Sequence, residues 1–106
     1  MIEIEVFSGS DGKITGFTVN GHSGTADYGQ DIVCAGVSSL TQTALLGLGE
    51  YLHRAMEYSV ASGELTMKLK EVPDELTEAI LETMLLGLIE IQKLNPEVIK
   101  IRKKRR

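Results

Sequence analysis

The chain has 106 residues, enough for one domain with a modest core and too few for a second domain. Apolar residues make up 42% and charged residues 25%, a balance typical of a globular protein and unlike that of a disordered chain. The single cysteine excludes an intrachain disulfide and, with only two histidines, disfavours a structural zinc site. We therefore expect a protein without metal or cofactor in a reducing cytoplasm.

The net charge of −4 is unevenly distributed along the chain. Six of the eleven basic residues lie between Lys100 and Arg106, which leaves residues 1–99 with a net charge of −10. A basic terminal run forms either an arm that faces nucleic acid or a charged end that keeps the chain soluble and protects the edge of a last strand. The second interpretation is favoured.

Two strands are predicted first. Residues 1–7 alternate apolar and acidic side chains, which indicates a strand with one buried face. Turn residues at 8–13 lead to a returning strand at 14–20, in which Gly16 marks a bulge or a close approach by another backbone. Because the start of the chain lacks a basic, apolar leader and the apolar runs are short, we expect neither a signal peptide nor a membrane span.

A glycine-rich loop follows the second strand. Gly21, Gly24 and Gly29 fall within nine residues, which favours a loop over a strand or a helix. Residues 25–28 resemble a lid able to close over an extended peptide. Within it, Tyr28 would either stack on a substrate side chain or anchor the loop to the protein.

The loop ends where the first helix begins. Apolar residues recur every three to four positions from Val33 onward, which predicts a helix over residues 32–52 with Asp31 as its N-cap. Cys34 then lies in the first turn, where unpaired N–H groups and the helix dipole favour its reactive thiolate. His22 is twelve residues earlier on a flexible loop. A cysteine and a histidine so placed indicate covalent catalysis on an acyl group.

The second half of the chain predicts three strands and a helix. Strands are expected at residues 56–60 and 64–70, and a helix capped by Asp74 runs to about Leu94. A short last strand at 98–101 precedes the basic tail. Tyr51 and Tyr58 are expected in the core or at an interface. The three glycines of the first helix indicate either tight packing against a neighbour or fraying after Gly47.

The second helix is apolar on more than one side. Beyond its main stripe it carries further apolar residues that also need cover, so we expect a homodimer. The stripe consists of Leu76, Ile80, Met84, Gly87, Ile91 and Leu94, and the additional residues are Leu81, Leu85, Leu88 and Ile89.

The predicted order ββαββαβ indicates an α+β fold of two layers, with two helices on a largely antiparallel five-stranded sheet. Residues 1–106 form a single domain, with a basic C-terminal tail at 102–106. On this order the Cys34 end of the first helix lies at one end of the sheet.

Two sequence blocks resemble a known family. The blocks Gly21-His22-x-Gly24 and Gly29-x-Asp31-Ile32-Val33-Cys34-Ala35-x-Val37-Ser38, in a short α+β chain, are similar to those of the ribosomal-processing cysteine protease Prp family. The resemblance implies a homodimeric endopeptidase that removes a short N-terminal extension from large-subunit ribosomal protein twenty-seven. It also implies that Cys34 is the nucleophile and His22 the general base. The family often has alanine after the histidine, where this chain has Ser23.

Three further residues near Cys34 have roles that the sequence leaves open. Asp31 is expected to be a structural cap, with orientation of His22 as the alternative. Backbone N–H groups around Cys34 and Ala35 are expected to meet the oxyanion. Ser38 lies one turn beyond Cys34 and either lines a substrate groove or is a small polar residue on a half-buried helix.

Two other functions compete with proteolysis. A protein that associates with the ribosome or RNA through its basic tail would bind RNA in a salt-sensitive way and would not need Cys34. The acidic body of the chain argues against such contact. A thiol redox sensor would use a reactive Cys34 without cleaving a peptide, but the chain has no second cysteine to resolve an oxidised one.

Overall fold

A computed structural model describes residues 1–22 and 31–106. The elements follow the predicted order, so the α+β architecture is confirmed. They are β1 (Ile2–Ser8), β2 (Ile14–Asn20), α1 (Ile32–Leu46), a π-helical turn η1 (Gly47–Tyr51), β3 (Met56–Ala61), β4 (Glu64–Leu69), α2 (Glu75–Leu94) and β5 (Ile99–Arg105).

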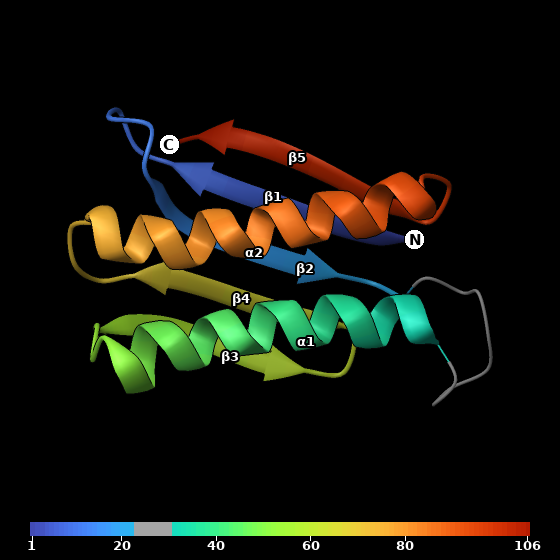
Figure 1. The fold of residues 1–106 in the computed structure, drawn as a ribbon, viewed down its shortest axis with the longest axis horizontal. Coiled ribbons are helices and arrows are strands. Elements are labelled where there is room, and N and C mark those ends of the chain that lie inside the picture. The colour runs from blue at the N-terminus through green and yellow to red at the C-terminus, as the bar shows by residue number, and fades with distance from the viewer. Residues whose placement is uncertain (23–30) are drawn as a thin grey trace.

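The five strands form one sheet in the order β3-β4-β2-β1-β5 (Figure 1). Strand β1 pairs antiparallel with β2 and parallel with β5, and the remaining pairs are antiparallel. The sheet is therefore largely antiparallel, as predicted. Its two edges are β3 and β5, which have very different compositions.

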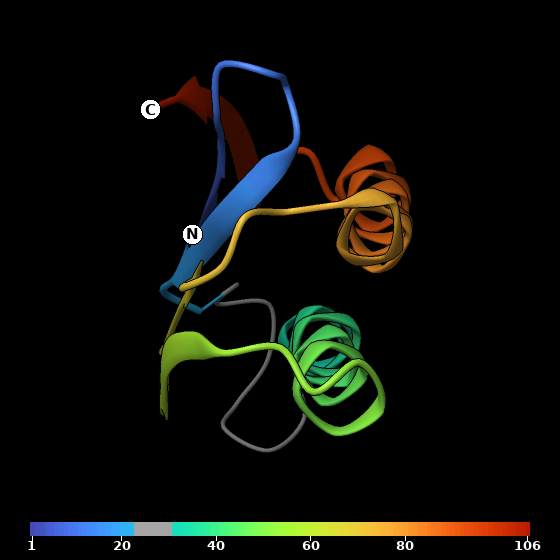
Figure 2. The same cartoon turned by 90° about the vertical axis from the view of Figure 1, so that its left-hand side faces the viewer.

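Both helices cover the same face of the sheet, and within residues 1–22 and 31–106 the opposite face carries no helix (Figure 2). Alternate residues of each central strand point toward the helices and are buried, which is the cause of the alternation seen in the sequence. The strand residues at the centre of this core include Ile4, Phe17 and Met67, each at most 3% exposed. The sheet face that the helices cover is thus the apolar one.

The first helix continues to the predicted end but changes its winding. After Leu46 the π-helical turn η1 carries the chain to Tyr51. A β-carbon built on Gly47 would lie 3.1 Å from Ile80 Cδ1, and one on Gly49 would lie 3.1 Å from Met56 Cε. Tight packing, and not fraying, therefore accounts for these two glycines.

Residues 32–51 are apolar enough, with a mean hydropathy of 1.5, to cross a membrane by length and composition alone. Length and composition alone therefore do not decide between a membrane span and a core helix, and the expectation of no membrane span stays a prediction. The helix nevertheless packs on the sheet, where Val37 and Leu48 are at most 2% exposed. Core helices of soluble domains commonly have such a composition.

The stripe assigned to α2 was partly wrong, because Met84 is buried as expected while its two end residues are exposed. The residues that α2 buries are Thr77, Leu81, Met84, Leu85 and Leu88, so most of the apolar residues that we considered surplus face the core. Leu76 and Leu94, which we placed on the stripe, are 56% and 83% exposed. The argument for a homodimer from surplus apolar residues is correspondingly weaker.

The last strand is longer than predicted, because β5 continues past Ile101 to Arg105. The basic tail is mostly strand and lies beside the acidic residues of β1. Arg102 pairs with Glu3 at 3.5 Å, and Lys104 pairs with Glu5. Beyond the strand, the Arg106 guanidinium stacks over the Phe7 ring at 4.1 Å. The tail thus forms an edge of the sheet, and protection of that edge stays the favoured interpretation.

Gly16 accounts for another feature of the sheet. A β-carbon at this position would overlap the main-chain oxygen of Met67 on β4. The pairing of β1 with β2 also shifts register between Phe7 and Ser8, close to Gly16. Both alternatives predicted for this glycine, a bulge and a close backbone approach, therefore occur here.

Candidate active site

Asp31 places Cys34 at the start of α1. The Asp31 side chain accepts a hydrogen bond from Cys34 N at 2.9 Å, which is the N-cap contact predicted from the sequence. This contact fixes Cys34 in the first helical turn, and its side chain is half-buried. The sulfur therefore lies near the positive end of the helix dipole.

His22 follows the end of β2 and reaches the cysteine. His22 Nδ1 lies 3.6 Å from Cys34 Sγ, within hydrogen-bonding range for sulfur. The histidine is exposed, so solvent and a substrate have access to the pair. The arrangement brings together a thiol and an imidazole that are twelve residues apart in the chain.

The backbone around His22 is held by two other segments. Gly21 adopts a φ of 96°, and its N–H donates to Gly63 O at 2.8 Å in the turn between β3 and β4. Met1 N donates to His22 O at 2.6 Å. The end of β2 is thereby fixed to the start of β1 and to the β3–β4 turn.

Gly63 also provides the space for the imidazole ring. It has a φ of 73°, and a β-carbon built on it would lie 2.6 Å from His22 Nε2. Any larger residue at this position would collide with the ring. The absence of a side chain at Gly63 therefore allows the ring orientation that directs Nδ1 to the cysteine.

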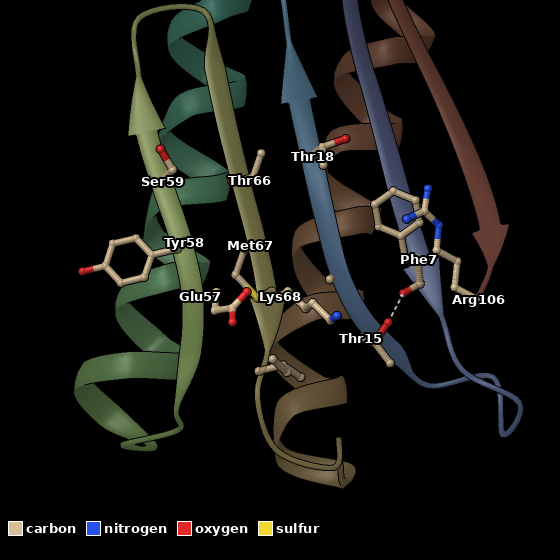
Figure 3. A pocket seen from close by; sticks show the side chains of 12 residues that line it. Phe7, Thr15, Thr18, Glu57, Tyr58, Ser59, Thr66, Met67, Lys68 and Arg106 are labelled. Atoms are coloured by element: carbon tan, nitrogen blue, oxygen red, sulfur yellow. Dashed lines mark hydrogen bonds between the residues drawn. The ribbon is translucent and has the colours of Figure 1, made fainter.

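A small cavity of about 50 Å³ opens beside Cys34. Cys34, Ser38 and Gln42 of α1 form one wall, and Val60 and Ala61 of β3 contribute to the other. A larger hollow of about 660 Å³ lies on the sheet face without helices, and neither Cys34 nor His22 lines it (Figure 3). The small cavity is the one next to the thiol.

The structure places some of the other predicted site residues beside Cys34 and leaves others outside the described part of the chain. Ser38 lines the cavity, and Ala35 is exposed while its N–H donates to Asp31 O at 3.0 Å. Both N–H groups that we expected at the oxyanion, those of Cys34 and Ala35, thus have acceptors on Asp31 in this structure. Tyr28 and the predicted lid at 25–28 lie outside the described residues.

Sequence reasoning missed Gly63, Gln42 and Val60. Gly63 lies between the strands predicted at 56–60 and 64–70, but nothing in a single sequence indicates that this connection packs against His22. Gln42 lies two turns after Cys34 on α1, so helical spacing alone could have suggested it.

Three carboxyl groups outside the site have displaced pKa values. A hydrogen bond from Arg54 lowers the pKa of Asp74, one from Lys104 lowers that of Glu5, and burial raises that of Glu78. Within residues 1–22 and 31–106, no group of three His, Cys, Asp or Glu side chains is placed to hold a metal ion. The chemistry available at the described site is that of the thiol, the imidazole and the first N–H groups of α1.

Comparisons with known proteins agree with this geometry. A family model described as "Cysteine protease Prp" matches residues 1–100. The chain is 29% identical over 104 residues to the ribosomal processing cysteine protease Prp of Staphylococcus aureus, in strains Mu50 and NCTC 8325. Each match covers 95% of this chain and 97% of the relative.

The fold is also similar to solved structures. One is the S. aureus protease Prp in complex with a covalently linked product peptide, with a TM-score of 0.92, 25% identity, and coverage of 98% of this chain and 100% of that one. A second is the same protease with a substrate peptide, with a TM-score of 0.86, 24% identity and the same coverage. SMU.848 from Streptococcus mutans has a TM-score of 0.81 and 24% identity, covering 100% of this chain and 96% of that one.

Proposed function

The chain belongs to the Prp family of cysteine proteases, and on that premise we propose that it removes a short N-terminal extension from large-subunit ribosomal protein twenty-seven. The observation that carries this proposal is the 3.6 Å contact between Cys34 Sγ and His22 Nδ1 at the start of a helix. The relatives from S. aureus are named as ribosomal processing proteases, which supports a ribosomal protein as the substrate class.

In the first step His22 takes the proton of Cys34, and the thiolate sulfur attacks the carbonyl carbon of the scissile peptide bond. The half-buried sulfur is at the N-terminal end of α1, where the dipole favours negative charge. The carbonyl π electrons move to oxygen, and the tetrahedral intermediate carries its negative charge there.

The oxyanion needs donors that are not already engaged. Because the N–H groups of Cys34 and Ala35 donate to Asp31, we assign this role to the N–H groups of Ile32 and Val33. These first helical residues have no acceptor four positions earlier in the helix. Their N–H groups belong to the helix terminus that favours an anion.

The intermediate collapses when the carbon–nitrogen bond breaks. The imidazolium of His22 gives its proton to the leaving amine, and the acyl group stays on Cys34 as a thioester. Water, deprotonated by His22, then attacks the thioester and releases the carboxylate product and the free thiol. Each half of the cycle returns His22 to its starting protonation state.

The test is mass spectrometry of the full-length ribosomal protein after incubation with the enzyme. We expect the wild-type chain to remove the N-terminal extension, whereas Cys34→Ala and His22→Ala leave it intact. His53→Ala is a matched control, because it removes the other histidine, which lies in the exposed segment before β3. Cleavage by Cys34→Ala, or an intact substrate with the wild-type enzyme, would contradict the proposal.

A second measurement tests whether Cys34 reacts as a thiolate. Iodoacetamide should label Cys34 at a pH well below about 8.5, the ordinary thiol pKa, because the thiolate is the reacting species. A labelling rate that rises only around that value would exclude an activated thiol.

A further inference from the structure

Strand β3 is a free edge of the sheet. Within the described part of the chain it pairs with β4 alone. Ala55 O accepts from Lys70 N at 3.0 Å, immediately before the first paired residues of the ladder. Because bonded and non-bonded pairs alternate in an antiparallel ladder, Tyr58 and Val60 direct their main-chain N–H and C=O groups to the free edge.

This edge has little of the usual protection. Open edges are normally protected by lysine, proline or other charged residues that prevent pairing with another chain. Strand β5 at the opposite edge is rich in lysine and arginine, but β3 carries one charged residue, Glu57, and neither lysine nor proline. The contrast indicates that β3 is kept available for a partner.

The free edge of β3 runs toward the Cys34 thiol. Strand β3 runs toward the end of the sheet where α1 begins (Figure 1). Val60 and Ala61, its last residues, line the same cavity as Cys34 and Ser38. A chain paired along β3 would therefore pass directly into this cavity.

Two of the exposed side chains of β3 are large and apolar, and they lie at alternate positions. Tyr58 is 61% exposed and Val60 48%, although their cross-strand partners Met67 and Leu65 are only 3% and 5% exposed in the core. The partners' burial places both side chains on the helix side of the sheet. Figure 3 shows Tyr58 extending from β3 away from β4.

From these observations we propose that the substrate binds as an additional strand on the free edge of β3. The occupant is an extended peptide segment whose apolar side chains, at alternate positions, contact Tyr58 and Val60. Its main chain pairs with the N–H and C=O groups of these two residues, which delivers one end of the segment to Cys34. This inference rests on the proposed protease function and adds how the substrate is held.

The first test uses a synthetic peptide that spans the N-terminal extension of ribosomal protein twenty-seven and its cleavage site. A set of peptides, each N-methylated at one backbone amide, removes one hydrogen-bond donor at a time. We expect KM to rise roughly three- to tenfold at every second position, because alternate amides face β3. Equal effects at all positions, or none outside the scissile bond, would overturn strand pairing.

The second test changes the edge itself. Tyr58→Lys should raise KM for the unmodified peptide roughly fivefold or more, with a smaller change in kcat, because it replaces an apolar contact by an edge-blocking charge. Val72→Lys is the control, since Val72 is 82% exposed but lies in the connection between β4 and α2, at the end of the sheet opposite the start of α1 (Figure 1). An equal effect in both variants would overturn the role of β3.

The outcomes separate docking from the protease function. If the peptide is not cut but still slows the labelling of Cys34 by iodoacetamide, and Tyr58→Lys removes this protection, docking holds while the cleavage assignment fails. If the peptide is cut and neither N-methylation nor Tyr58→Lys changes KM, the cleavage assignment holds while docking on β3 fails. If Tyr58→Lys converts a dimer into a monomer in light scattering, a second copy occupies the edge and the proposal is wrong.

Discussion

Gly63 offers a direct test of how the His22 ring is positioned. Gly63 and Gly12 both have positive φ, 73° and 83°, so alanine is strained by about 1 kcal/mol at either position. A β-carbon at Gly63 would meet the ring, whereas nothing lies within 4 Å of one at Gly12. We expect Gly63→Ala to lower kcat/KM at least about tenfold relative to Gly12→Ala.

The measurement compares steady-state kinetics with thermal unfolding for both variants. Similar melting temperatures with different activities would attribute the loss to the ring position. Equal activities would mean that the turn between β3 and β4 does not set the position of His22.

Asp31 can be tested as a cap and as an orienting group. Its side chain accepts from Cys34 N, and asparagine retains an acceptor suited to the same contact. We expect Asp31→Asn to keep kcat within about threefold of wild type, and Asp31→Ala to lose about 1 kcal/mol of unfolding free energy. A loss of kcat of about a hundredfold in Asp31→Asn at unchanged stability would show instead that the carboxylate orients His22.

For single residues, the sequence predicted best those positions whose role depends on neighbours close by in the chain. Asp31 and Cys34 were placed correctly because a cap and a first turn depend on neighbours within a few residues. Gly63 and Val60 were missed because they approach Cys34 and His22 only through strand pairing, which no local pattern records.

The N-cap of helix α2 is a titratable residue, Asp74. The hydrogen bond from Arg54 lowers the pKa of Asp74, whose side chain also accepts from Leu76 N and Thr77 N. A carboxyl whose pKa is lower in the folded state adds stability above its unfolded pKa and loses it as the pH falls through the folded value. Asp74→Asn keeps a capping oxygen but not the charge.

We therefore expect Asp74→Asn to melt below wild type near neutral pH, and the difference to shrink below about pH 4. Thermal unfolding over a pH series measures it. A difference in melting temperature that is constant down to pH 2 would show that the charge of Asp74 is not responsible.

The spacing between β2 and β4 depends on Gly16. A side chain there would overlap Met67 O, which belongs to the backbone and cannot rotate away. We expect Gly16→Ala to reduce the free energy of unfolding by about 2–3 kcal/mol, measured by denaturant titration. Gly9→Ala is the comparison, because a β-carbon there makes only ordinary contacts of 3.6 Å and longer.

The order of the elements was predictable because each has a clear period and clear end signals. The length of β5 was not, since its basic run resembles a solvated tail until it is set against the acids of β1. The π-helical turn was likewise hidden, because its glycines are explained by contacts with Ile80 and Met56, which lie outside the turn.

At the scale of the whole molecule, the open question is its oligomeric state. We propose a homodimer, supported by large apolar residues of the helices that remain more than half exposed, namely Ile32, Leu46, Leu76, Leu86 and Leu94. Light scattering at micromolar concentration should give twice the 11.6 kDa mass of the chain. A monomeric mass would show that these residues are simply solvated.

The parallel pairing of β1 with β5 has a consequence for synthesis. Ile2 pairs with Ile99 and Ser8 with Arg105. Strand β1 is synthesised before β5, so it cannot complete its pairing until β5 has also been synthesised. Until translation reaches residue 105, the outer edge of β1 is open to other nascent chains, and the sheet remains one strand short. We infer that the five-stranded sheet is completed only after β5 has been synthesised.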